Sequence, residues 1–160
     1  MDKESQSKLV KMIRTQRVAA LGTLRDGGPL VSMILYVVPP NFENFYIHAS
    51  RLAQHTQDFL SDPRVSLMIS EPDCEADDPQ LLARVSIIGT IQDVSKTTQE
   101  YETVKSLYLK RFPKAVTMFQ LGDFAMYRIQ PKKARYVAGF GKAFNLTLDD
   151  FMQASLTESE

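Results

Sequence analysis

The stretch RVAALGTLRDGGPLVSMILYVV, residues 17–38, carries the clearest structural signal in this chain of 160 residues. The apolar side chains of residues 17–24 and 30–38 predict two strands. The sequence DGG between them is a strong turn signal. Together these features predict an antiparallel β-hairpin.

Working outward from the hairpin, the remaining pattern consists of strands with a few helices between them. Helices are expected over residues 50–61 and 95–111, where apolar side chains recur at helical spacing, and Gly89 is expected to mark a bulge or kink. Several strands follow one another directly, which predicts a closed, mainly β antiparallel barrel instead of a doubly wound sheet, in one domain, residues 1–160. The further strands are expected over residues 45–49, 65–70, 82–94, 124–129 and 135–138.

The charge composition limits the classes of partner that are expected. The chain has 19 Lys and Arg against 19 Asp and Glu, which argues against a nucleic-acid partner or a membrane-surface partner. Acidic residues gather in residues 71–80, whereas residues 128–142 carry five basic side chains and no acidic one. Cys74 is the single cysteine, so no internal disulfide forms. Without a signal-like start or an apolar run of bilayer length, a cytoplasmic location is expected.

The segment HASRLAQHT, residues 48–56, is the strongest candidate for a ligand site. A strand that runs into a helix N-terminus directs free backbone N–H groups toward one spot. Ser50 adds a hydroxyl there and Arg51 adds a charge, a combination that suits a phosphate monoester. The alternative is that Ser50 only caps the helix while Arg51 is solvated.

Other candidate residues give weaker signals. Arg84 is either an exposed strand residue or a contact to an anionic group. The basic segment 128–142 is either part of a site or an edge strand protected by its charge. His48 and His55 fit no zinc-binding motif, so no metal site is expected. No motif identifies a catalytic residue.

The order of several segments resembles the pyridoxamine 5′-phosphate oxidase-like, FMN-binding split-barrel family, and especially its bacterial haem-utilisation branch. The resemblance covers about residues 9–146. It implies a six-stranded antiparallel split barrel with flanking helices, and a homodimer with FMN at the subunit interface. The segments are LGTLRDGGPLVSMILYVVPP, NFYIHASRLAQHTQDFLSDPRVSLMI, ARVSIIGTIQDV and GDFAMYRIQPKKARYVAGFGKA.

The resemblance also implies which residues contact the cofactor. Where the oxidase has an Arg-Lys pair beside the phosphate, this chain has Gln54 and His55, so Arg51 must supply more of the charge. The implied contacts are Ser32 and Met33 along the flavin ring, His48, Ser50, Arg51, Leu52, His55 and Thr56 around the phosphate, Arg84 on a strand, and Gly139 and Lys142 from the partner subunit.

Four further positions bear on the substrate. The oxidase holds its substrate's phosphate with Lys, Tyr, Arg and Ser, and the matching residues here are Val37, Tyr108, Phe112 and Val116. Three of the four polar groups are lost, so true pyridoxamine phosphate oxidase activity is not expected.

The resulting expectation is an FMN-dependent oxidoreductase acting on an unassigned small molecule. Two alternatives stay open: a non-catalytic carrier of flavin or haem, and a haem-degrading protein. The extended haem-utilisation proteins carry an axial histidine in an extra C-terminal region. In this chain no histidine follows His55, so that route to haem ligation is absent.

Overall fold

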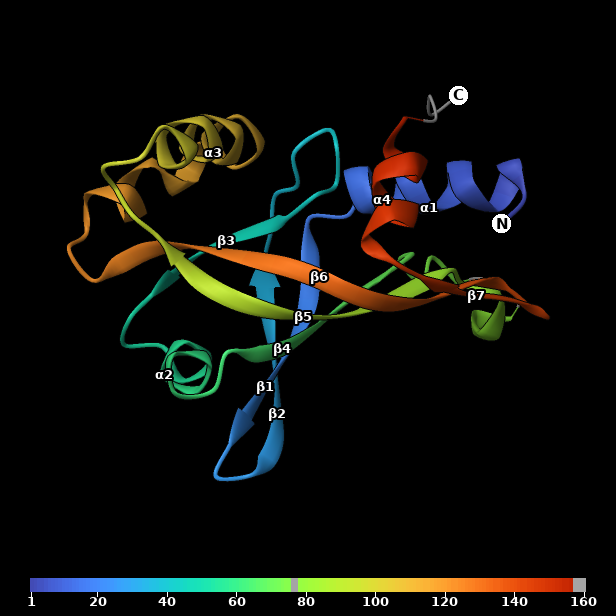
Figure 1. The fold of residues 1–160 in the computed structure, drawn as a ribbon, viewed down its shortest axis with the longest axis horizontal. Coiled ribbons are helices and arrows are strands. Elements are labelled where there is room, and N and C mark those ends of the chain that lie inside the picture. Colours follow the sequence, from blue (N-terminus) through green and yellow to red (C-terminus); the bar gives the residue numbers. More distant parts are fainter. Residues whose placement is uncertain (76–77, 157–160) are drawn as a thin grey trace.

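A computed structural model describes residues 1–75 and 78–156, and its centre is one antiparallel sheet (Figure 1). The strands follow the order β2–β1–β4–β5–β6–β3, and β7 pairs with β6. The strands are β1 (Val18–Arg25), β2 (Gly28–Leu35), β3 (Phe45–Ser50), β4 (Arg64–Ser70), β5 (Arg84–Val94), β6 (Phe124–Gly139) and β7 (Lys142–Leu146).

The predicted hairpin is present as β1 and β2. Arg25 pairs with Gly28, which leaves Asp26 and Gly27 as a two-residue turn. Both turn residues have positive φ, 50° for Asp26 and 79° for Gly27. Such turns match the right-handed twist of the strands and require residues that tolerate the left-handed region, as Asp and Gly do.

The sheet curls into a barrel that stays split. Its two end strands, β2 and β3, approach each other where Val37 and Tyr46 form a bridge. The Val37 amide donates to the Tyr46 carbonyl at 2.9 Å, and the Tyr46 amide donates to the Val37 carbonyl at 2.8 Å. Within the described residues this bridge is the only pairing between the two ends. The mainly β split barrel that the resemblance implies is therefore confirmed. The closed barrel expected from the succession of strands is wrong, because the two end strands of the described chain meet only at this bridge.

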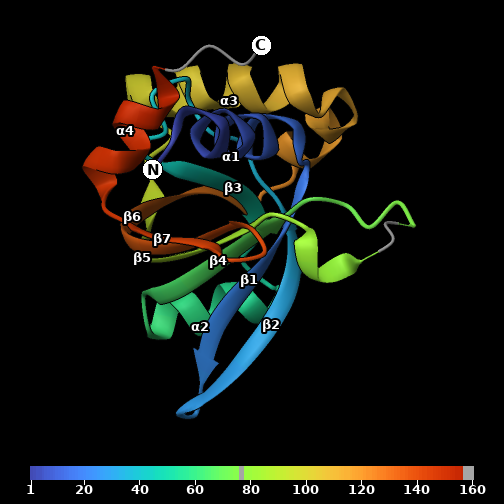
Figure 2. The same cartoon turned by 90° about the vertical axis from the view of Figure 1, so that its right-hand side faces the viewer.

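Helices cover two opposite sides of the strands, with α1, α3 and α4 on one side and α2 on the other (Figure 2). Within residues 1–75 and 78–156, no helix combines the length and the apolar character needed to span a bilayer. The helices are α1 (Lys3–Thr15), α2 (Gln54–Ser61), α3 (Gln99–Arg111) and α4 (Leu148–Ser155), with two 3-10 segments, η1 (Pro79–Leu81) and η2 (Pro113–Gln120).

One expectation about the strands is wrong. Residues 124–129 and 135–138 do not form two strands but belong to the single 16-residue strand β6. Pro131, which cannot donate a ladder hydrogen bond, lies where the β5–β6 register shifts, opposite Gly89. The pairing therefore continues past the proline, and the predicted irregularity at Gly89 is confirmed.

Replacing Gly89 with alanine should lower the free energy of unfolding by about 1–3 kcal/mol, the usual range for overpacking. A Cβ atom at this position would collide with the backbone carbonyl oxygen of Gln130, which the neighbouring strand holds in place. Urea denaturation measures the change. Gly122→Ala is the control, because a Cβ atom there would meet no heavy atom within 4 Å. Equal stability of the two variants would contradict the tight approach at the bulge.

Candidate functional site

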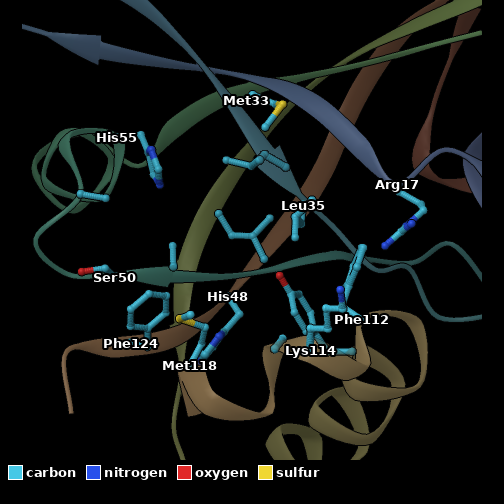
Figure 3. A pocket seen from close by; sticks show the side chains of 16 residues that line it. Arg17, Met33, Leu35, His48, Ser50, His55, Phe112, Lys114, Met118 and Phe124 are labelled. Atoms are coloured by element: carbon cyan, nitrogen blue, oxygen red, sulfur yellow. The ribbon is translucent and has the colours of Figure 1, made fainter. Parts of the chain in front are cut away.

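A cavity of about 530 Å³ opens between β2, β3, α2, the end of α3 and η2 (Figure 3). Most of its lining is apolar, and no Asp or Glu is part of it. The lining residues are Arg17, Met33, Ile34, Leu35, Ile47, His48, Ala49, Ser50, Ala53, His55, Tyr108, Phe112, Lys114, Ala115, Met118 and Phe124.

His48 projects from β3 into an aromatic environment. Its imidazole stacks on the Phe119 ring with a centroid distance of 3.8 Å and an interplanar angle of 7°. The Tyr108 and Phe124 rings lie 5.8 and 5.2 Å away. Burial, together with the positive charges of Lys96 and Lys105, lowers the pKa of His48 to about 4. The imidazole is therefore neutral at pH 7.

His55 reaches into the same cavity from the first turn of α2, and Figure 3 shows its ring directed toward the centre. Burial lowers the pKa of His55, and the carboxylate of Asp58 opposes this shift. Its ring makes one loose aromatic contact, to Phe59 at 6.3 Å. Across residues 1–75 and 78–156, neither the His48 nor the His55 imidazole forms a hydrogen bond, so both rings keep nitrogen atoms for a ligand.

The strand-to-helix junction is already occupied by internal hydrogen bonds. The Arg51 amide donates to the Asp123 carbonyl at 2.7 Å, the Leu52 amide to the Ser50 hydroxyl at 3.1 Å, and the Ala53 amide to the Ser50 carbonyl at 3.1 Å. The Ser50 hydroxyl itself donates to the Asp123 carboxylate. Ser50 does not cap α2 either, because Ala53 is the N-cap residue. A phosphate at Ser50 would therefore face the Asp123 carboxylate, and the amides of residues 51–53 are not free to donate to it.

The charge expected beside the phosphate is also engaged elsewhere. The Arg51 guanidinium pairs with the Asp93 carboxylate at 3.2 Å, and both side chains are about half exposed. Leu52, the next residue, is exposed. Thr56 is fully buried, and its hydroxyl has no hydrogen-bond partner within the described part of the chain.

The other predicted cofactor residues lie outside the cavity. Ser32 lines a second hollow on the outer face of β1, β2 and β4. Arg84 donates to the Leu82 carbonyl at 3.0 Å. Gly139 and Lys142 flank the turn between β6 and β7, where Lys142 pairs with Glu4 at 3.3 Å. Met33, His48, Ser50 and His55 are the predicted residues that the structure brings together in the cavity lining.

The wall of the cavity that faces β3 was not predicted from the sequence. Lys114, Ala115 and Met118 come from η2, which was not predicted, and Arg17 comes from the approach to β1. No residue of η2 is buried. One signal did exist. Tyr108 and Phe112, which match substrate-binding positions of the oxidase, both line the cavity.

The sequence is similar to those of a known family and of two known proteins. The sequence model of a family described as CREG, β-barrel, matches residues 5–153. Heme oxygenase HutZ of Vibrio cholerae is 28% identical over 128 residues, which are 79% of this chain and 72% of that protein. The chloroplastic non-canonical heme oxygenase HOZ of Arabidopsis thaliana is 40% identical over 95 residues, which are 59% of this chain but 27% of that protein.

Solved structures share the fold. A heme-binding protein from Mycobacterium smegmatis superposes with a TM-score of 0.83 at 22% identity, over 93% of this chain and 60% of that one. A protein of the pyridoxinephosphate oxidase family from Clostridium acetobutylicum superposes with a TM-score of 0.69 at 13% identity, over 94% of this chain and 99% of that one. The resemblance to the oxidase-like split barrels is thereby confirmed for the fold.

The expectation of FMN as cofactor, and of an FMN-dependent oxidoreductase, is wrong. The two curated relatives are named as heme oxygenases, and no flavin appears in their names. The physical reason lies at the junction, where the amides of residues 51–53 and the side chains of Ser50 and Arg51 are bonded within the chain. The haem alternative that the sequence left open is the one these findings favour.

Proposed function

The chain belongs to the CREG β-barrel family, and we propose that it binds haem in the cavity between β2, β3, α2 and η2. The observation that carries the proposal is a pair of neutral histidines, His48 and His55, in a largely apolar cavity. The names of the curated relatives supply the ligand.

The cavity suits a large apolar ring. Its volume of about 530 Å³ lies in the range of roughly 300–1,000 Å³ that is usual for small-molecule sites. Ile34, Leu35 and Ile47 from the strands and Phe112 and Met118 from the opposite wall offer apolar contact to a porphyrin.

A histidine can hold the iron. Haem iron is commonly ligated by a neutral imidazole, and burial keeps both imidazoles neutral at pH 7. His48 is stacked on Phe119 and surrounded by further rings, whereas His55 is directed toward the open centre of the cavity. We therefore assign the role of iron ligand to His55 and that of a wall residue to His48.

The outer face of the sheet supports a homodimer as the assembled form. On β2, Val31 and Met33 are 69% and 73% exposed, and Val18, Met68 and Ile88 on neighbouring strands are also exposed. Several large apolar side chains exposed on neighbouring strands of one sheet indicate a protein interface. Met33 borders the cavity as well, so a second copy on this face would shield the bound haem. A single-chain mass in light scattering would contradict the dimer.

Titration of the purified protein with haem tests the proposal. We expect a shifted Soret band that saturates at one haem per chain, and we expect no displacement by excess FMN. Arg51→Ala serves as the matched control, because Arg51 pairs with Asp93 outside the cavity, so its haem affinity should stay within about twofold of wild type. A spectrum that remains that of free haem throughout would refute the proposed function.

Oxidative breakdown of haem is the second candidate function, because both curated relatives are named as heme oxygenases. In that case haem would be the substrate, dioxygen the oxidant, and an external reductant the electron source. Ascorbate added in air to the haem complex separates the two functions. Decay of the Soret band with release of iron supports breakdown, whereas a persistent band leaves binding as the function.

A further inference from the structure

Two guanidinium groups lie against the Phe112 ring at one end of the cavity, and a lysine lines the same end. The Arg17 guanidinium lies over this ring at 5.3 Å from the centroid, and the Arg111 guanidinium lies 5.9 Å from it. Lys114 follows Phe112 by two positions and lines the cavity together with Arg17. The end of the cavity opposite His55 therefore carries a concentrated positive charge (Figure 3).

No carboxylate balances this charge within the described residues. Arg17, Arg111 and Lys114 are absent from every ion pair of residues 1–75 and 78–156. Arg111 donates to the backbone carbonyls of Arg14, at 2.7 Å, and of Gln16. Burial and the nearby charge of Arg17 lower the pKa of Arg111, whereas Tyr36 opposes this.

An apolar cavity with unpaired cations at one end favours an amphipathic anion. The side chains of Arg17 and Lys114 can reach such a ligand, because neither side chain forms a hydrogen bond or an ion pair in the described chain. We propose that Arg17 and Lys114 bind the two carboxylates of a planar dicarboxylate ligand, which selects haem by its propionates and orients them toward Phe112. This inference rests on the proposed haem binding and names the groups that give it specificity.

The orientation follows from the two ends of the cavity. With the carboxylates at Arg17 and Lys114, the ring extends along Ile34, Leu35 and Ile47 toward His55. The charged edge then lies at the exposed side chains of Arg17 and Lys114, and the apolar edge lies against Ile34 and Ile47, which are buried.

The test compares haem with haem dimethyl ester, in which both carboxylates are blocked. Wild type should bind haem about three- to tenfold more tightly than the ester, as expected for two partly solvated ion pairs. Arg17→Gln/Lys114→Gln should bind both compounds equally, with the affinity that wild type shows for the ester. Lys3→Gln/Lys11→Gln removes the same charge from the exposed side of α1 and should keep the wild-type preference. Circular dichroism verifies that each variant is folded.

The outcomes separate this inference from the function on which it depends. Equal affinity of wild type for haem and ester, with both bound in the cavity, would overturn the carboxylate assignment and leave haem binding intact. A preference that survives in Arg17→Gln/Lys114→Gln would also overturn it. If neither compound binds to wild type, the proposed function and this inference fail together.

Discussion

A His55→Ala variant is expected to bind haem at least about tenfold more weakly than wild type and to lose the absorbance and EPR features of histidine ligation. Partners that only orient a metal ligand are already worth about 10–100-fold in metal affinity, so removing the ligand itself should cost no less. His55 is the candidate because its ring faces the cavity and forms no hydrogen bond within the described chain.

His48→Phe is the matched control for this experiment. Phenylalanine preserves the stack on Phe119 and the size of the ring while it removes the imidazole nitrogens. We expect its haem spectrum to keep the histidine signature, and we expect added imidazole to restore that signature to His55→Ala. The reverse result, with the signature lost in His48→Phe and kept in His55→Ala, would assign the iron to His48.

The same assignment predicts a pH dependence. Burial lowers the pKa of His55 below its usual value of 6.5. The imidazole is therefore neutral at pH 7, and it stays mostly neutral until the pH falls to the lowered pKa. A proton competes with iron for the same nitrogen, so ligation should be complete at neutral pH and decline as the pH falls through this lowered value. An acid titration of the Soret band measures the decline.

A Phe45→Ala variant is expected to lose about 3–5 kcal/mol in the free energy of unfolding. Phe45 is fully buried on β3, and its ring lies 5.9 Å from Tyr36 and 6.3 Å from Phe151. The Tyr36 hydroxyl donates to the Ile13 carbonyl at 2.7 Å, which ties the cluster to α1. Truncating Phe45 therefore leaves a void between the sheet, α1 and α4.

Phe140→Ala provides the comparison for this stability measurement, since the Phe140 side chain is 83% exposed at the turn between β6 and β7. The same chemical change there should alter the unfolding free energy by less than about 0.5 kcal/mol. Thermal or urea denaturation of both variants gives the difference. Similar losses for the two variants would show that Phe45 does not hold the helices to the barrel.

Local sequence patterns were sufficient for the parts of the fold that are built from local contacts. The β1–β2 hairpin depends on Asp26 and Gly27, which supply the positive φ angles of its turn. The irregularity at Gly89 could also be predicted, because a glycine inside a strand has no side chain to pack and often marks a bulge. These features need no information from distant residues.

The remaining elements depend on long-range packing. Strand β7 was not predicted, because Leu146 is its only buried residue and pairing with β6 alone defines it. Pro131 indicated a break in β6, whereas the bulge opposite Gly89 accommodates it. Helix α4 lies beyond the region that the family resemblance covered, and its Phe151 is fixed by contact with Phe45.

The candidate site was predictable in part for the same reason. His48 and His55 come from one short segment, so their proximity could be inferred from sequence. The partners that neutralise the junction could not, because Asp123 is 73 residues from Ser50 and Asp93 is 42 residues from Arg51. A phosphate site inferred from Ser50 and Arg51 alone therefore omitted the two carboxylates that fill it.

A crystal structure of the haem complex would show directly whether haem occupies the cavity beside His55. We expect the porphyrin between β2, β3 and η2, with the iron facing His55 and the propionates beside Arg17 and Lys114. Haem bound instead on the outer face near Ser32 and Met68, with the cavity occupied by side chains, would contradict this expectation.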